Sequence, residues 1–75
     1  MANADPILTA FGRSVRRQRA SKKLTQEKLA ERANLDPTYI SGIERGLRNP
    51  GIKNVVRIAK AFGLSTAELC RGIDR

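Results

Sequence analysis

The sequence predicts an all-α fold, a compact five-helix bundle in a single domain over residues 1–75. Two observations favour this fold class. Helix-start and helix-stop signals recur along the 75 residues, and no segment is a convincing strand. A chain of this length buries only about 60% of the surface that it exposes when unfolded, so we expect one small core and no deep substrate cleft.

The first helix is expected to begin at Pro6, with Asp5 as its N-cap, and to end near residues 21–23. Aspartate accepts hydrogen bonds from the free amides of a first helical turn, and proline suits the first helical position because no hydrogen bond is lost there. Leu8, Phe11 and Val15 recur at helical spacing and should form the apolar face.

Three further helix starts share one pattern, in which an apolar residue before the N-cap pairs with an apolar residue in the first turns. This hydrophobic staple fixes the angle at which the chain enters a helix. The pattern predicts helices near residues 25–33, 37–45 and 65–71. The staples and caps are Leu24, Thr25 and Leu29, then Leu35, Asp36 and Ile40 with Pro37 at the first position, then Leu64, Ser65 and Leu69 with Glu68 completing a capping box.

The remaining helix is expected over residues 52–62, with Gly51 as an acceptable cap. Glycine also stands just past three of the helices, where a left-handed residue ends a helix at low cost. These glycines are Gly46, Gly63 and Gly72. The apolar face of the helix should comprise Ile52, Val55, Val56, Ala59 and Phe62.

A tight corner separates the second and third helices, because only Asn34, Leu35 and Asp36 lie between them. Asn34 is expected in the left-handed conformation, because Asn tolerates this conformation better than any residue except Gly. Ala30 should face inward, where its methyl group lets the two helices approach closely, and Leu35 should enter the core. Two short helices joined at a steep angle by such a turn form a helix-turn-helix, here over residues 25–45.

The chain is strongly basic, with 15 Lys and Arg against 7 Asp and Glu and a formal charge of +8. This excess favours polyanionic partners: nucleic acid first, an acidic membrane surface second and an acidic protein third. One cysteine and no histidine exclude an intramolecular disulfide and argue against a zinc site, and neither a cofactor nor an enzyme activity is expected. Without a signal peptide or a membrane-spanning run, we expect a cytoplasmic protein.

The third helix has two unlike faces. Ile40 and Ile43 should point to the core, while the opposite face is small, polar and positive at its end. A face with few bulky groups can enter a major groove and approach base edges. An isolated helix would more simply present this face to solvent, but the corner, the caps and the charge together favour DNA. We assign base readout to Thr38, Ser41, Gly42 and Arg45, with Gly42 giving close approach.

Residues 13–69 resemble the phage-repressor type of helix-turn-helix domain, the Cro/C1 or xenobiotic-response-element family. The matching segments are LTQEKLAERANL, TYISGIERG, RNP and IKNVVRIAKAFG. The resemblance implies a lambda-repressor-like domain that binds operator DNA, usually as a dimer, with 37–45 as the recognition helix. The small size and the TYISGIERG segment also resemble stand-alone controller proteins of restriction–modification systems, which activate or repress their own operon; a prophage repressor would look similar.

Two charges are expected on the core side of their helices. Arg19 lies one turn beyond Val15, and Glu44 lies one turn beyond Ile40. Either charge alone would be costly to bury, whereas a pair can offset the cost. We expect Arg19 and Glu44 to pair and to tie the first helix to the recognition helix, as the family resemblance also implies. The alternative is that both side chains bend out to solvent.

Phosphate contacts position a DNA-binding domain, and base contacts specify its site. The resemblance places the start of the second helix and the loop after the recognition helix on the DNA backbone. Pro37 departs from the long polar side chain of many relatives, so DNA shape is expected to carry part of the specificity. The assigned backbone contacts are Gln26, Arg48, Asn49, Lys53 and Asn54, with Tyr39 either reaching a phosphate or packing at the edge of the core.

A two-fold dimer would place two recognition helices about 34 Å apart on one face of the duplex. The expected function is therefore a homodimeric, autoregulatory transcription factor with no evident small-molecule effector. A rival interpretation is a DNA-binding antitoxin, although little sequence follows the last helix to bind a toxin. The expected dimer surface, some of which could instead complete the core, comprises Leu64, Ala67, Leu69, Cys70 and Ile73.

Overall fold

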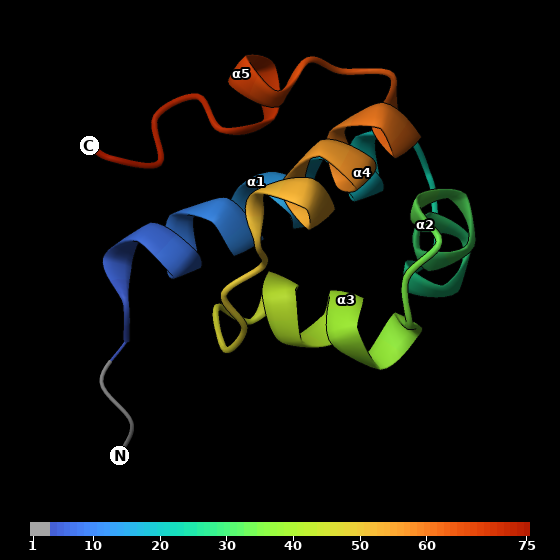
Figure 1. Cartoon of the computed structure of the whole chain (residues 1–75), viewed down its shortest axis with the longest axis horizontal. Coiled ribbons are helices and arrows are strands. Elements are labelled where there is room, and N and C mark those ends of the chain that lie inside the picture. Colours follow the sequence, from blue (N-terminus) through green and yellow to red (C-terminus); the bar gives the residue numbers. More distant parts are fainter. Residues whose placement is uncertain (1–3) are drawn as a thin grey trace.

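The computed structural model describes residues 4–75, which form five α-helices (Figure 1). They are α1 (Pro6–Ser21), α2 (Gln26–Ala33), α3 (Pro37–Glu44), α4 (Ile52–Phe62) and α5 (Thr66–Leu69). No strand occurs among residues 4–75, and the predicted all-α fold is confirmed. None of the helices in this range is long and apolar enough to cross a membrane. In Figure 1, α3 and α5 lie at opposite edges of the molecule, with α1 and α4 between them.

The predicted polar caps all accept hydrogen bonds from the helices that they start. Asp36 Oδ1, for example, accepts from the Thr38 amide at 2.7 Å. At α5 the capping box is complete, and hydrogen bonding to Ser65 lowers the pKa of the Glu68 carboxyl. The helix starts are therefore fixed locally, by side chains within each first turn. The caps of this kind are Asp5, Thr25, Asp36 and Ser65.

Helices α2, α3 and α4 end in the same way. A left-handed residue follows the last turn, namely Asn34 at φ 57°, Gly46 at φ 73° and Gly63 at φ 72°. The next amide then bonds back across the turn, as when Leu35 donates to the Ala30 carbonyl oxygen at 2.9 Å. Leu35 thus ends α2 and begins the entry into α3. Lys23 is also left-handed, at φ 56°, which the sequence did not predict.

The core lies where α1, α2, α3 and α4 meet, and α5 closes it. Leu24, Leu35 and Leu64 pack against it from the helix corners, so each predicted staple contributes apolar contact. Burying such side chains is the main stabilising contribution in a domain of this size. The largest fully buried side chains are Val15, Leu29, Ile40, Ile43, Ile58 and Leu69.

The apolar face of α4 differs from the predicted one. Ile58 is fully buried, although it was not assigned to that face. Ile52 is 70% exposed and Val56 is only half-buried. Because successive residues turn by about 100° around a helix, a face centred on residues 55, 58, 59 and 62 leaves residues 52 and 56 at its margin.

A glycine allows α1 and α3 to pack backbone against backbone. A Cβ atom at Gly12 would lie 2.7 Å from the Glu44 carbonyl oxygen and would also clash with the Ile43 carbonyl oxygen. Farther along α1, the buried Ser14 hydroxyl donates to the Leu69 carbonyl oxygen at 2.6 Å. Helix α1 therefore holds the end of α3 on one side and the end of α5 on the other.

We expect Gly12→Ala to lower the free energy of unfolding by about 1–3 kcal/mol, because backbone atoms would have to move. Urea denaturation followed by circular dichroism measures the change. Gly51→Ala is a matched control, since nothing lies within 4 Å of a Cβ there. That control should change stability by no more than about 1 kcal/mol. Equal losses in the two variants would contradict a close α1–α3 contact.

Candidate nucleic-acid interface

The outward face of α3 presents three of the residues assigned to base readout. Thr38 and Arg45 are exposed, and Ser41 is half-buried. On the opposite side Ile40 and Ile43 are completely buried. The two isoleucines therefore fix which face of the helix is open, as the sequence predicted.

A polar hollow of about 400 Å³ lies between the start of α2 and the open face of α3. Thr38 and Ser41 line it from α3, opposite Gln26 and Glu27 from α2. The sequence interpretation did not assign Glu27, although its place next to Gln26 in the first turn could have indicated it. A carboxylate in this position can accept a hydrogen bond from a base amino group but repels a phosphate.

Gly42 was also assigned to this face, and its place there is covered by another side chain. It is buried, because the side chain of Arg48 crosses over it from the loop after α3. A Cβ atom at Gly42 would lie 2.7 Å from Arg48 Cγ. Because Gly42 has no side chain, the aliphatic part of the Arg48 side chain can pack directly against α3.

Arg48 continues from Gly42 to the ring of Tyr39. Its guanidinium carbon lies 5.8 Å from the ring centroid, within the range of a cation–π contact. The Tyr39 hydroxyl accepts a hydrogen bond from Asn54 Nδ2 at 3.2 Å, and the ring packs against the core. Tyr39 therefore packs at the core edge, and its contact with a phosphate stays a prediction, since the hydroxyl keeps its own hydrogen to donate. Asn49 and Lys53, which follow Arg48 in the chain, are exposed to solvent.

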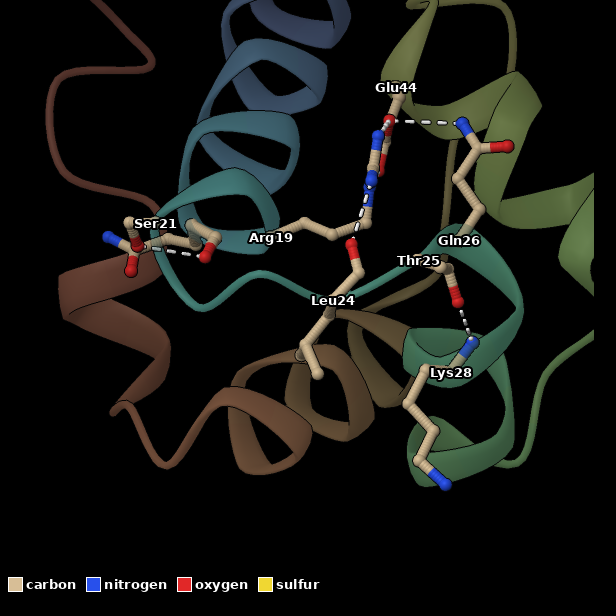
Figure 2. A network of polar contacts seen from close by, with 8 residues as sticks. Arg19, Ser21, Leu24, Thr25, Gln26, Lys28 and Glu44 are labelled. Carbon is tan, nitrogen blue, oxygen red and sulfur yellow. Dashed lines mark hydrogen bonds and ion pairs between the residues drawn. The ribbon is translucent and has the colours of Figure 1, made fainter.

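Arg19 and Glu44 form the predicted ion pair between α1 and α3 (Figure 2). Arg19 Nε donates to Glu44 Oε2 at 2.7 Å, and Nη2 donates to Oε1 at 3.0 Å. Arg19 Nη1 also donates to the Leu24 carbonyl oxygen at 2.9 Å. The Arg19 side chain is 18% exposed and that of Glu44 is 3% exposed, so water competes little. The guanidinium joins α1, the end of α3 and the segment that leads into α2.

The positive charge of Arg19 is insensitive to pH in the neutral range. Hydrogen bonding to Glu44 raises the pKa of the Arg19 guanidinium above its usual value. A basic group whose pKa rises on folding contributes stability at every pH below its unfolded pKa, and loses it only as the pH rises through the folded pKa. The Arg19 charge therefore persists through the neutral range.

Gln26 is a third member of this network, and the sequence interpretation missed its contact. Its Nε2 donates to Glu44 Oε1 at 3.1 Å (Figure 2). The prediction placed this side chain on a phosphate. An amide nitrogen carries two hydrogens, so the observed bond leaves one of them to reach an anion. Gln26 can therefore serve both the ion pair and a phosphate.

The predicted dimer surface is only partly available. Leu69 is completely buried against the core, so its assignment to that surface is wrong. It is the staple partner of Leu64 and fills the space under α5. Leu64, Cys70 and Ile73 are half-buried against the core, whereas Ala67 is exposed. Burial raises the pKa of the Cys70 thiol, which fits the packing role.

An apolar groove of about 220 Å³ lies where the N-terminal ends of α1 and α4 meet the C-terminal tail, residues 70–75. Ile7 is 53% exposed and Ile52 is 70% exposed beside it. In Figure 1 these two helix ends lie on the same side of the molecule as the C-terminal end of α3. None of the lining residues is charged; they are Ile7, Leu8, Phe11, Asn49, Pro50, Ile52, Val55, Cys70 and Ile73.

Comparison with known sequences relates this arrangement to proteins that share the motif. A family model described as helix-turn-helix matches residues 15–69. The chain is 48% identical over 64 residues to Control protein C.BamHI of Bacillus amyloliquefaciens, which covers 84% of this chain and 79% of that protein.

Solved structures of controller proteins share the fold. The restriction-modification controller protein C.AhdI from Aeromonas hydrophila has a TM-score of 0.81 and 40% identity, covering 83% of this chain and 94% of that chain. The controller protein C.Esp1396I, a tetramer in complex with its natural 35 base-pair operator, has a TM-score of 0.81 and 38% identity, covering 91% and 90%. These relatives are described as controllers, which gives the antitoxin interpretation no support.

Breaking the ion pair from one side should destabilise the fold. We expect Arg19→Met or Glu44→Leu to lower the free energy of unfolding by about 2–4 kcal/mol, because a poorly hydrated charge loses its partner. The double variant Arg19→Met/Glu44→Leu should recover most of the loss, since no unpaired charge remains. Chemical denaturation at neutral pH measures all three.

The matched control is Lys28→Met, which removes an exposed pair with Glu31 whose atoms lie 3.2 Å apart. Its effect should stay within about 1 kcal/mol, because water screens an exposed pair. A double variant that loses as much as the sum of the two single variants would show that the contact between Arg19 and Glu44 contributes nothing as a pair.

Proposed function

The chain belongs to the helix-turn-helix family, and we propose that it is a sequence-specific DNA-binding regulator of transcription that acts as a homodimer on a two-fold operator. The observation that carries the proposal is the way α3 is presented. Ile40 and Ile43 are buried and Glu44 is bound by Arg19, so the small polar face of α3 can only face outward. The proposed class is the autoregulatory controller protein, in keeping with the names of the relatives.

Thr38, Ser41 and Arg45 are the proposed base-reading side chains. Hydroxyl groups can donate or accept at a base edge, and an arginine can donate two parallel hydrogen bonds to guanine O6 and N7. Two of the three side chains are short, so α3 would have to lie deep in the major groove. Pro37 adds no donor at the start of the helix, so sequence-dependent DNA shape supports the remaining specificity.

Gln26 and the segment after α3 are the proposed phosphate contacts. Gln26 retains one amide hydrogen, and the exposed Asn49 and Lys53 follow the recognition helix in the chain. The formal charge of +8 adds an attraction to any DNA, which weakens as salt rises. Phosphate contacts of this kind would set the register in which α3 meets the bases.

The proposed homodimer contact is the apolar groove between α1, α4 and the C-terminal tail, with a second copy of the chain as its occupant. Each copy carries a charge of +8, so two copies repel each other least where the lining is uncharged. Ile7 and Ile52 expose large apolar side chains at the groove, a pattern typical of interaction sites.

The position of the groove also suits a two-fold operator. The ends of α1 and α4 that line the groove lie on the side of the molecule toward which the C-terminal end of α3 points (Figure 1). A two-fold axis at that side would bring the two recognition helices to one face of the duplex. Among the relatives, C.Esp1396I binds its operator as a tetramer, so self-association on DNA has a precedent.

Dimerisation would let the concentration of the protein control how much of the operator is bound. When the dimer is weak, operator occupancy rises steeply with protein concentration, and no small-molecule effector is required. Such a protein acts in the cytoplasm, where its DNA lies. This mode of control suits a regulator of its own operon.

Footprinting on the DNA upstream of the gene tests the proposed function. We expect protection of paired half-sites whose centres lie about one helical turn, or a multiple of it, apart. Arg45→Ala should abolish the footprint at the same protein concentration, because it removes a base-reading guanidinium. Arg57→Ala removes the same charge from an exposed position on α4 and should leave the footprint in place.

A different footprint in the same experiment would contradict the proposed function. Uniform, strongly salt-dependent protection that is equal in both variants would mean that charge alone binds the DNA. A specific operator would then be excluded.

A separate prediction concerns the dimer. Ile52→Asp should weaken self-association at least about tenfold, because a charge would enter an apolar contact. Sedimentation equilibrium measures it, and the monomer should stay folded because the side chain is exposed. Ala67→Asp places the same charge on α5 and should leave association unchanged. Loss of association in Ala67→Asp but not in Ile52→Asp would show that α5, and not the groove, forms the dimer contact.

A further inference from the structure

The loop after α3 turns back over the recognition helix. Helix α3 ends at Glu44, and Gly46 follows with a φ of 73°. The Leu47 amide then donates to the Gly42 carbonyl oxygen at 2.9 Å. This reversal of the chain carries the next residue, Arg48, across the helix that it has just left.

The stem of Arg48 occupies the place that a side chain of residue 42 would take. A Cβ atom at Gly42 would lie 2.7 Å from Arg48 Cγ, 3.5 Å from Nε and 3.7 Å from Cδ. All three neighbours belong to one flexible side chain. A larger residue at position 42 would therefore displace Arg48 and leave the backbone of α3 where it is.

Tyr39 supports the other end of the same side chain. The guanidinium carbon of Arg48 lies 5.8 Å from the centroid of the ring. The ring itself is held, because it packs against the core and its hydroxyl accepts from Asn54 Nδ2 at 3.2 Å. The exposed Arg48 side chain thus contacts Gly42 along its stem and Tyr39 at its head.

We propose that Gly42 and Tyr39 form a seat that positions Arg48 on the recognition helix for contact with DNA. Gly42 and Tyr39 are positioning residues, which act through Arg48 and need no DNA contact of their own. A guanidinium that is already ordered loses less conformational freedom on binding, so the seat raises affinity by preorganisation. The DNA-binding part of this inference rests on the proposed function, whereas the seat exists in the free protein.

The seat gives Gly42 a role different from close approach of the helix to the bases. If close approach were the reason for glycine, a methyl group at position 42 would weaken binding whatever stands at position 48. If the seat is the reason, the methyl group acts only by displacing Arg48. The two roles therefore differ in how substitutions at the two positions combine.

Tyrosine fluorescence tests the seat without DNA. The chain contains one Tyr and no Trp, so the emission reports on Tyr39 alone. Gly42→Ala and Arg48→Ala should change the emission intensity in the same direction and by similar amounts, because each removes the guanidinium from the ring. Gly51→Ala should leave it unchanged. Gly42→Ala should not lower the melting temperature, since alanine favours the interior of a helix.

Operator affinity, measured by fluorescence anisotropy of labelled operator DNA, tests the consequence. Gly42→Ala and Arg48→Ala should each weaken operator binding about tenfold, and the double variant should bind no worse than Arg48→Ala. Arg57→Ala, which removes a charge elsewhere, sets the loss expected from charge alone.

Two results would overturn the inference. Unchanged tyrosine emission in both Gly42→Ala and Arg48→Ala would show that Arg48 does not occupy the seat. An equal loss of affinity on adding Gly42→Ala, whether Arg48 is present or absent, would show that Gly42 acts at the DNA directly. If the unsubstituted protein fails to prefer any operator, the proposed function fails, and the fluorescence result still decides whether the seat exists.

Discussion

The paired hydrogen bonds between Arg19 and Glu44 are the constraint on which the rest of the structure depends. Apolar contacts alone hold a short helix against a core but leave it free to rotate or slide, because dispersion and burial have little direction. The guanidinium and carboxylate planes meet in a two-pronged contact that has direction. Through Leu24 and Gln26 the same pair also fixes the start of α2. The helix-turn-helix is therefore located from its two ends at once.

Much of the fold could be predicted because its determinants are local. The caps and staples lie within a few residues of each helix start, and Asn34 marks the corner by its tolerance of the left-handed conformation. The face of α4 was predicted less well, although its buried centre at Val55, Ile58, Ala59 and Phe62 follows the i, i+3, i+4, i+7 spacing of a helix. Whether Ile52 at the margin of that face is covered depends on the ends of α1 and of the chain, which lie beside it. Leu69 was misassigned for a similar reason, because whether α5 covers the core or a partner is a long-range property.

In the candidate site too, some contacts could be predicted from the sequence and others could not. The Arg19–Glu44 pair was predictable, since both charges extend an apolar face by one helical turn and neither can be buried alone. The contacts of Gln26 and Gly42 were not, because they depend on the path of long side chains after the backbone turns. Arg48 reaches Gly42 only because Gly46 reverses the chain. Long flexible side chains that follow a left-handed residue are thus where sequence patterns carry least information about a binding surface.

The most direct measurement of the central claim is the ratio of operator to non-specific DNA affinity for Arg19→Met/Glu44→Leu, at one salt concentration. This variant keeps an apolar contact between α1 and α3 but removes the directional bond. If the ion pair positions the recognition helix, the folded variant will still bind DNA through its charge, and the ratio will fall toward one. An unchanged ratio in a folded variant would contradict the claim and show that apolar packing alone sets the position of α3.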